Sequence, residues 1–181
     1  DGSVTVNADN SGQTVTQGGG SAVPDEAPVI TQRESSVETG NTIAISTSDN
    51  AAANVTIKDI NIKSSNDAID VKGSSSANIT LEGDNKIFSE TGSALHISDG
   101  NVTINGSGSL KAEIQDEPFG YNHNAKIGSH EKEDMSGSIH ITGDATVKTD
   151  DNTASDCEGD GAGIGSGEYG EMSGNIVIDG N

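Results

Sequence analysis

The chain has almost no aromatic residues and almost no cysteine. Of its 181 residues, two are Phe, two are Tyr and none is Trp. Aromatic side chains normally supply much of the apolar area of a core. The core of this chain therefore has to be thin and built mostly from Ile, Val and Ala. The single cysteine, Cys157, cannot form an internal disulfide, which excludes a disulfide-stabilised scaffold.

Positive charge and long apolar runs are also scarce. Nine Lys and Arg residues stand against 29 Asp and Glu, and the formal net charge is −20. Such a field repels nucleic acids and anionic membrane surfaces but attracts cations, calcium first among them. No stretch approaches the roughly 18 apolar residues of a membrane span. We therefore expect neither nucleic-acid binding nor membrane insertion. Because the chain starts at Asp1 rather than Met, we also expect a piece of a longer protein.

What the chain does contain is one stretch written twice. Residues 124–144 read NAKIGSHEKEDMSGSIHITGD, and residues 161–181 read GAGIGSGEYGEMSGNIVIDGN. With an offset of 37 residues and no gap, 11 of these 21 positions are identical. Self-similarity at a fixed period in this range is typical of stacked structural units.

Short β-branched runs, broken by Ser, Gly, Asn and Asp, fill residues 41–181. Inward Ile, Val and Leu alternate with outward Thr, Lys, Asp and Ser, which is typical of strands, and helical spacing appears nowhere at usable length. Three such strands per unit of about 23 residues predict an all-β fold, a right-handed parallel β-helix (β-solenoid), in which two 37-residue coils carry loop insertions. The residues expected to open successive units, and to form a side-chain ladder, are Asn54, Asn78, Asn101, Ser138 and Asn175. One expected inward row is Val55, Ile79, Val102, Ile139 and Ile176.

Residues 1–40 are less regular, because Gly-rich stretches and two prolines interrupt their strand-like runs. We expect irregular N-terminal strands or a cap there, with part of the segment disordered as the alternative, and β-helix coils over 41–181. The last coil stops partway round at Asn181. We therefore expect the parent protein to continue with further units and the chain to associate end to end.

Several strings resemble those of secreted and surface proteins of clostridial and related Gram-positive bacteria, which carry right-handed β-helices described as carbohydrate-binding domains. The matching stretches are NVTIKDINIK (54–63), NVTINGSGSL (101–110), GAGIGSG (161–167) and GNIVIDGN (174–181). The resemblance implies a secreted or cell-surface location and binding rather than catalysis. NAKIGSH departs from GAGIGSG at Asn124 and Lys126, which would alter a site built on bare backbone there.

An acidic segment, KTDDNTASDCEGDGAG (148–163), predicts a calcium site. Asp156, Glu158 and Asp160 stand at alternate positions before a glycine, as in the first half of a calcium loop. The second half of such a loop is missing, so Asp150 or Asp151 would have to complete the ligand shell. The alternatives are a solvated acidic loop without an ion, or another metal.

Ligand contact is predicted for a few aromatic and histidine side chains. Exposed rings can stack on a sugar while polar neighbours fix its orientation. The candidates are Phe119, Tyr121 and His123 in one insertion and Tyr169 in the next coil. As the alternative, Phe119 plugs the base of its own loop.

Enzyme signatures are weak. A polysaccharide lyase needs a basic residue beside its calcium carboxylates, and the only arginine, Arg33, lies far from the acidic segment in sequence. For a galacturonan hydrolase, only Asp150-Asp151 matches an expected string. The four histidines, His96, His123, His130 and His140, do not cluster in sequence.

The sequence thus predicts a non-catalytic carbohydrate-binding module or adhesin, stabilised by calcium and binding a neutral polysaccharide. One alternative is a structural stalk or adhesin whose partner is a host surface protein. The other is a β-helix polysaccharide lyase or hydrolase.

Overall fold

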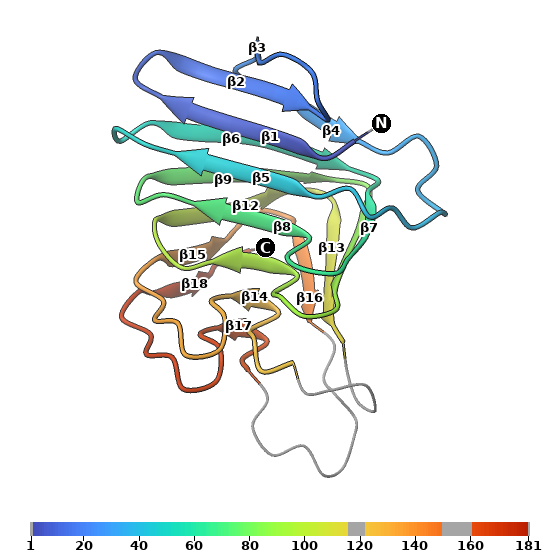
Figure 1. Cartoon of the computed structure of the whole chain (residues 1–181). Helices are drawn as coiled ribbons and strands as arrows, with labels where there is room; N and C mark the ends of the chain where they lie inside the picture. Colours follow the sequence, from blue (N-terminus) through green and yellow to red (C-terminus); the bar gives the residue numbers. More distant parts are fainter. Residues whose placement is uncertain (1, 116–121, 150–160, 181) are drawn as a thin grey trace.

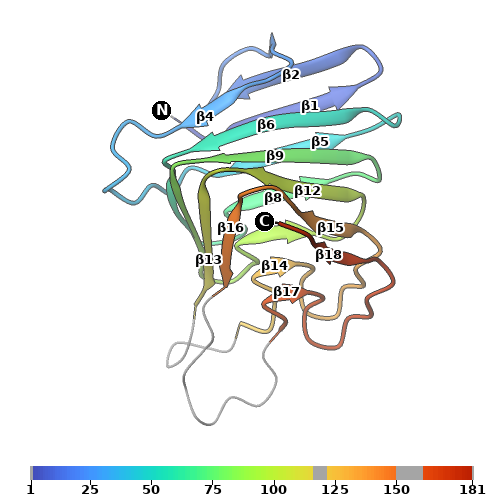
Figure 2. The same ribbon diagram turned by 180° about the vertical axis from the view of Figure 1, so that it is seen from behind.

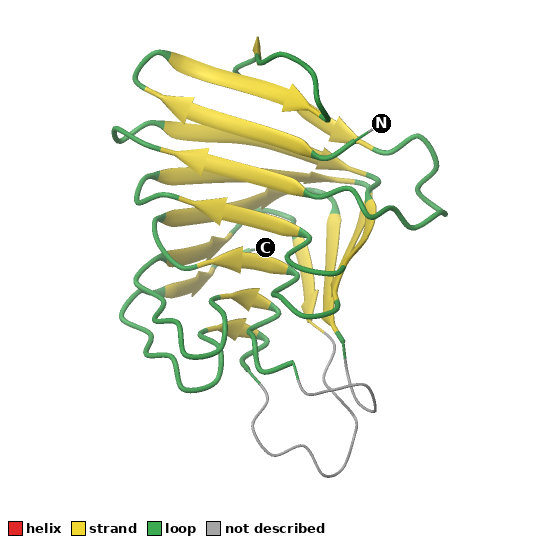
Figure 3. Cartoon of the chain, viewed as in Figure 1, coloured by secondary structure: helices red, strands yellow, loops and turns green. Residues whose placement is uncertain are grey.

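The computed structural model describes residues 2–115, 122–149 and 161–180, and over these ranges every regular element is a strand (Figure 3). The all-β prediction is confirmed. No helix in these ranges could span a lipid bilayer.

The strands form three sheets. The eight-stranded sheet contains, in spatial order, β17 (Ile164–Gly165), β14 (Ile127–Gly128), β11 (Leu95–Ile97), β8 (Ile69–Lys72), β5 (Ile43–Thr47), β1 (Val4–Asp9), β2 (Gly12–Gln17) and β3 (Val23–Pro24). The six-stranded sheet contains β18 (Ile176–Ile178), β15 (Ser138–Ile141), β12 (Asn101–Gly106), β9 (Ser76–Glu82), β6 (Ala52–Lys58) and β4 (Val29–Thr31). The four-stranded sheet contains β16 (Thr146–Thr149), β13 (Ser109–Ile114), β10 (Asp84–Ser89) and β7 (Asn61–Ser64).

The two larger sheets lie on opposite sides of the molecule, and the four-stranded sheet runs steeply along a third side (Figures 1 and 2). From β5 onward the chain visits the eight-, six- and four-stranded sheets in turn, so each strand pairs in parallel with the equivalent strand of the next unit. Their inward side chains form one apolar cluster dominated by Ile, Val, Leu and Ala, as the composition predicts.

The predicted right-handed parallel β-helix is wrong. Among the described residues there is no closed solenoid: the strands belong to three separate sheets of 8, 6 and 4 strands, and β1–β2 and β2–β3 pair antiparallel. The repeats indicate which residues stack from unit to unit. Whether the sheets join at their corners depends on the turns, about which the repeats say nothing.

The predicted unit of about 23 residues is also slightly short. Asn54 and Asn78 pair at a separation of 24 residues, and Asp70 and His96 at 26. Asn101 lies beside Ser76 rather than Asn78. The sequence cannot detect this two-residue shift, because side chains alternate with period two and the same face stays inward.

The expected side-chain ladder is also reduced: among the described residues, one hydrogen bond joins two side chains of the row, and the Ser138 hydroxyl accepts the backbone N–H of Asn175. Asn78 Nδ2 donates to Asn54 Oδ1 at 2.9 Å. The side-chain amide of another residue, Asn85, forms hydrogen bonds at a corner between strands. Asn85 is 1% exposed, and its Nδ2 donates to the carbonyls of Glu82 and Ser109, both at 3.0 Å. Its Oδ1 accepts the N–H of Ile60 at 3.3 Å. Asn85 therefore satisfies backbone groups that strand pairing leaves free.

Residues 2–40 supply an antiparallel hairpin and two short strands. The hairpin joins the main body because β1 pairs in parallel with β5. Buried Gln13 adds a second link: its Nε2 donates to the carbonyl of Asn54 at 3.0 Å, and its Oε1 accepts the N–H of Asn54 at 2.8 Å.

Candidate functional site

The repeated stretch forms the same tight turn twice. We call residues 129–133 the first turn and residues 166–170 the second turn; they follow β14 and β17. Lys132 and Tyr169 occupy equivalent positions, with φ of 61° and 60°. Each turn is closed by its serine: Ser129 Oγ donates to the carbonyl of Glu133 at 2.7 Å, and Ser166 Oγ donates to that of Gly170 at 3.0 Å.

The two turns are also bonded to each other. The N–H of Lys132 donates to the carbonyl of Glu168 at 2.8 Å. The N–H of Glu168 donates in turn to the carbonyl of His123 at 2.9 Å. The turns are therefore a rigid extension of the eight-stranded sheet, and their side chains are held by fixed backbone.

Two of the predicted ligand-binding residues, His123 and Tyr169, lie at or next to these turns. Tyr169 is 75% exposed, and Lys132 Nζ lies 5.7 Å from the centroid of its ring. His123 Nδ1 lies 2.5 Å from Glu168 Oε2, on the residue next to Tyr169. Phe119 and Tyr121 lie outside the described residues, as do all five predicted calcium ligands, Asp150, Asp151, Asp156, Glu158 and Asp160.

The first turn also contacts a histidine–carboxylate cluster on the eight-stranded sheet. His96 is the central residue of β11 and pairs with Asp70 of β8 on one side and with Gly128 of β14 on the other. It is only 6% exposed. His96 Nδ1 lies 2.9 Å from Asp70 Oδ1, and Nε2 lies 2.9 Å from Glu133 Oε2. The buried imidazole is thus held between carboxylates from two different units.

His130 and Asp67 complete the cluster. The rings of His96 and His130 stack with centroids 3.9 Å apart and an angle of 8° between their planes. His130 Nε2 lies 2.7 Å from Asp67 Oδ1, and that oxygen also accepts the N–H of Ser93 at 2.8 Å. The donor atoms of Asp67, His96 and His130 all lie within 4.8 Å of one another, an arrangement that can hold a metal ion.

Comparisons with known proteins assign no family to this arrangement. A scan against protein-family models and searches of curated proteins and solved structures found no match for the chain. The functional argument therefore depends on the geometry of the chain itself.

The carboxylates around His96 determine its protonation. Burial on its own lowers the pKa of His96, but the hydrogen bonds to Asp70 and Glu133 and the charge of Asp67 outweigh it and raise that pKa to about 8. Burial would likewise raise the pKa of Asp70, yet the hydrogen bonds from His96 and Lys72 lower it below its ordinary value. At neutral pH His96 is therefore an imidazolium between ionised carboxylates.

This protonation predicts a loss of stability in mild alkali. A His whose folded pKa is raised stabilises the protein fully below its unfolded pKa of about 6.5, and this contribution disappears as pH rises through about 8. In EDTA, we expect the free energy of unfolding to fall by up to about 2 kcal/mol between pH 6.5 and 9. Urea unfolding at several pH values measures this. The His96→Gln variant should remove the dependence; an unchanged dependence would contradict the assignment.

Sequence reasoning missed the cluster because its histidines are far apart in the chain. One signal was present: aligning Ile69 with Leu95 places Asp70 directly beside His96, as β8 and β11 do. The contribution of the first turn could not be predicted, because the position of His130 over the His96 ring depends on how that turn folds back on the sheet. His140 lies apart from the cluster and pairs with exposed Asp179 at 2.8 Å.

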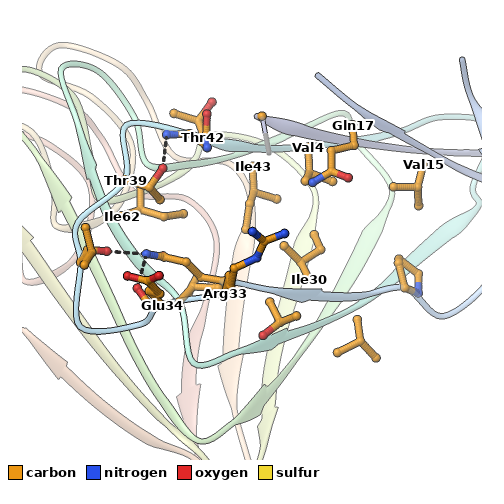
Figure 4. Close-up of a pocket in the computed structure, with 18 of the residues that line it drawn as sticks. Val4, Val15, Gln17, Ile30, Arg33, Glu34, Thr39, Thr42, Ile43 and Ile62 are labelled. Carbon is orange, nitrogen blue, oxygen red and sulfur yellow. Dashed lines mark hydrogen bonds between the residues drawn. The ribbon is translucent and has the colours of Figure 1, made fainter. Parts of the chain in front are cut away.

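A separate hollow of about 670 Å³ lies at the N-terminal end of the molecule (Figure 4). It is lined by aliphatic side chains such as Val4, Ile30 and Ile43 and by polar groups including Arg33 and Thr42. It shares no residue with the two turns or the cluster.

Proposed function

We propose that the chain is a non-catalytic carbohydrate-binding module or adhesin of a secreted or cell-surface protein, and that it binds sugar at the second turn. The observation that carries this proposal is Tyr169, an aromatic side chain 75% exposed on a turn whose backbone is hydrogen-bonded on both sides. A ring presented by such a turn can stack on the apolar face of a sugar, and the turn itself need not be ordered on binding.

Polar neighbours supply the hydrogen bonds that such a ligand needs. Lys132 and Glu168 lie beside the ring, and His123 contacts Glu168. These groups offer donors and acceptors to sugar hydroxyls. The net charge of −20 makes a polyanionic glycan an unfavourable ligand, so the proposed ligand is a neutral polysaccharide. Calcium binding by residues 150–160 remains a proposal based on their sequence.

Replacing Tyr169 tests the proposal. On a glycan array, the wild-type protein should bind a set of neutral glycans, and Tyr169→Ala should weaken that binding by at least about fivefold, because stacking of one ring contributes roughly 1–3 kcal/mol. The melting temperature should stay unchanged, since the ring is exposed. The matched control is Val23→Ala, which truncates another exposed apolar side chain, on β3.

Two results would contradict this site. Wild-type protein that binds no glycan contradicts sugar binding itself and favours a protein partner. Binding that survives Tyr169→Ala but disappears in Arg33→Ala would place the sugar in the N-terminal hollow instead.

A further inference from the structure

We propose that Asp67, Asp70, His96 and His130 bind one divalent transition-metal ion, and that Glu133 positions the two histidines for it. The proposal is independent of sugar binding, since none of these residues is among those proposed to contact sugar, which are His123, Lys132, Glu168 and Tyr169.

The donor atoms of Asp67, His96 and His130 lie together, and Asp70 joins them through its contact with His96. Asp67 faces His130 Nε2 with Oδ1 at 2.7 Å and His96 Nδ1 with Oδ2 at 4.0 Å. Asp70 Oδ1 lies 2.9 Å from the same His96 nitrogen. Ligands of a tetrahedral zinc ion, with bonds of about 2.0–2.1 Å, are separated by about 3.3 Å. The observed separations bracket that value. Because the two rings are parallel, both must tilt toward each other for their nitrogens to face one ion, which would take the place of the hydrogen-bond protons.

Glu133 occupies the opposite edge of the same rings. Its Oε2 lies 2.9 Å from His96 Nε2 and 3.6 Å from His130 Nδ1, and it accepts the N–H of His130 at 3.0 Å. A metal-bound histidine usually donates its other N–H to a carboxylate, which fixes the ring and strengthens it as a ligand. Here one carboxylate oxygen contacts the His96 ring and the His130 backbone and lies near the His130 ring.

The internal repeat shows that these side chains are not needed to build the turn. At the offset of 37 residues, His130 corresponds to Gly167 and Glu133 to Gly170. The second turn nevertheless has the same backbone hydrogen bond as the first: the N–H of its last residue donates to the carbonyl three residues earlier, at 3.1 Å in each turn. It also has the serine hydrogen bond that closes the turn. His130 and Glu133 therefore need an explanation other than folding of the turn, and a site shared with His96 provides one.

The donor set selects the class of metal. Two imidazole nitrogens with two carboxylates suit Zn²⁺, Co²⁺ or Ni²⁺, whereas Ca²⁺ prefers oxygen ligands alone. The cluster is partly accessible to solvent: His96 is buried, whereas His130, Asp67 and Asp70 are half-buried. Lys72 pairs with Asp70 Oδ2 at 2.6 Å, but its side chain is 66% exposed and can move away.

Cobalt titration of EDTA-stripped protein tests the site. We expect one equivalent of Co²⁺ to give the visible absorption of a tetrahedral N/O site, and Zn²⁺ to abolish it by competition. Calorimetry should show one Zn²⁺ bound, with Ca²⁺ unable to compete. The His130→Gly/Glu133→Gly variant, which recreates the residues of the second turn, should bind at least about 100-fold more weakly. It should keep its strand circular dichroism.

A matched control removes a histidine–carboxylate pair elsewhere. His140→Gly/Asp179→Asn eliminates a more exposed pair with a contact of 2.8 Å, and this variant should bind metal as the wild type does. His96→Gln provides a second, independent loss should the double variant fold poorly. Absent Co²⁺ binding in the wild type overturns the proposal, and so does unchanged binding in both the double variant and His96→Gln, because the ion would then lie elsewhere, such as on residues 150–160.

Discussion

Replacing Gly73 with alanine should destabilise the protein by about 3 kcal/mol, or lower its melting temperature by roughly 10 °C. Gly73 follows β8 and has φ of 103°, a conformation that L-residues rarely adopt. A β-carbon there would also lie far inside van der Waals contact with the carbonyl oxygen of Thr47, at the end of β5. The variant must therefore shift one strand of the eight-stranded sheet against its neighbour.

Thermal and urea unfolding of Gly73→Ala would measure this loss. The matched control is Gly19→Ala, because a β-carbon at Gly19 has no atom within 4 Å. The control should change the free energy of unfolding by less than about 0.5 kcal/mol. Equal stability of the two variants would mean that the close approach of β8 to the end of β5 is not present in solution.

Replacing Asn85 with leucine should be at least as damaging, at about 4 kcal/mol. Leucine has the same number and branching of side-chain heavy atoms, so no cavity forms, but the N–H of Ile60 and the carbonyls of Glu82 and Ser109 lose their partner. Each buried backbone group left without a hydrogen bond costs about 1–3 kcal/mol. The corner before β10 should open first, which hydrogen exchange at the amide of Ile60 would detect.

Asn78→Leu is the matched control for Asn85→Leu. The Asn78 side chain makes one hydrogen bond, to exposed Asn54, and strand pairing is independent of it. We expect a change below about 1 kcal/mol. A larger loss from Asn78→Leu than from Asn85→Leu would show that the outer asparagine row, rather than the corner amide, supports the stack.

These two asparagines illustrate what the sequence could and could not predict. Alternating Ile and Val established strands, an inward face and parallel stacking of similar units. The residue that each strand residue pairs with in the next unit could be predicted only to within two positions, because either register buries the same face. Asn101, for example, lies beside Ser76 rather than Asn78. The closed β-helix was wrong, since closure depends on corner geometry that repeats do not encode. Asn85 looked like any other strand residue until the corner around it was known.

The residues of the candidate site were likewise predictable from the sequence only in part. Tyr169 could be proposed from sequence because an isolated aromatic in a polar turn is conspicuous. The histidine–carboxylate cluster could not, because Asp67, His96 and His130 come from three successive units and meet only after the sheet has formed. The sequence did contain one relevant difference. In the repeated turn, His130 and Glu133 are present in one copy and glycines stand at the same positions in the other.

Anomalous diffraction at the zinc edge, from crystals grown with Zn²⁺, tests the metal assignment most directly. The geometry predicts one strong peak about 2.0–2.1 Å from His96 Nδ1 and His130 Nε2, with Asp67 and Asp70 completing the tetrahedron. Glu133 should remain on the opposite edge of both rings. A cluster that keeps its present hydrogen bonds, with no peak between the rings and Asp67, would contradict the account.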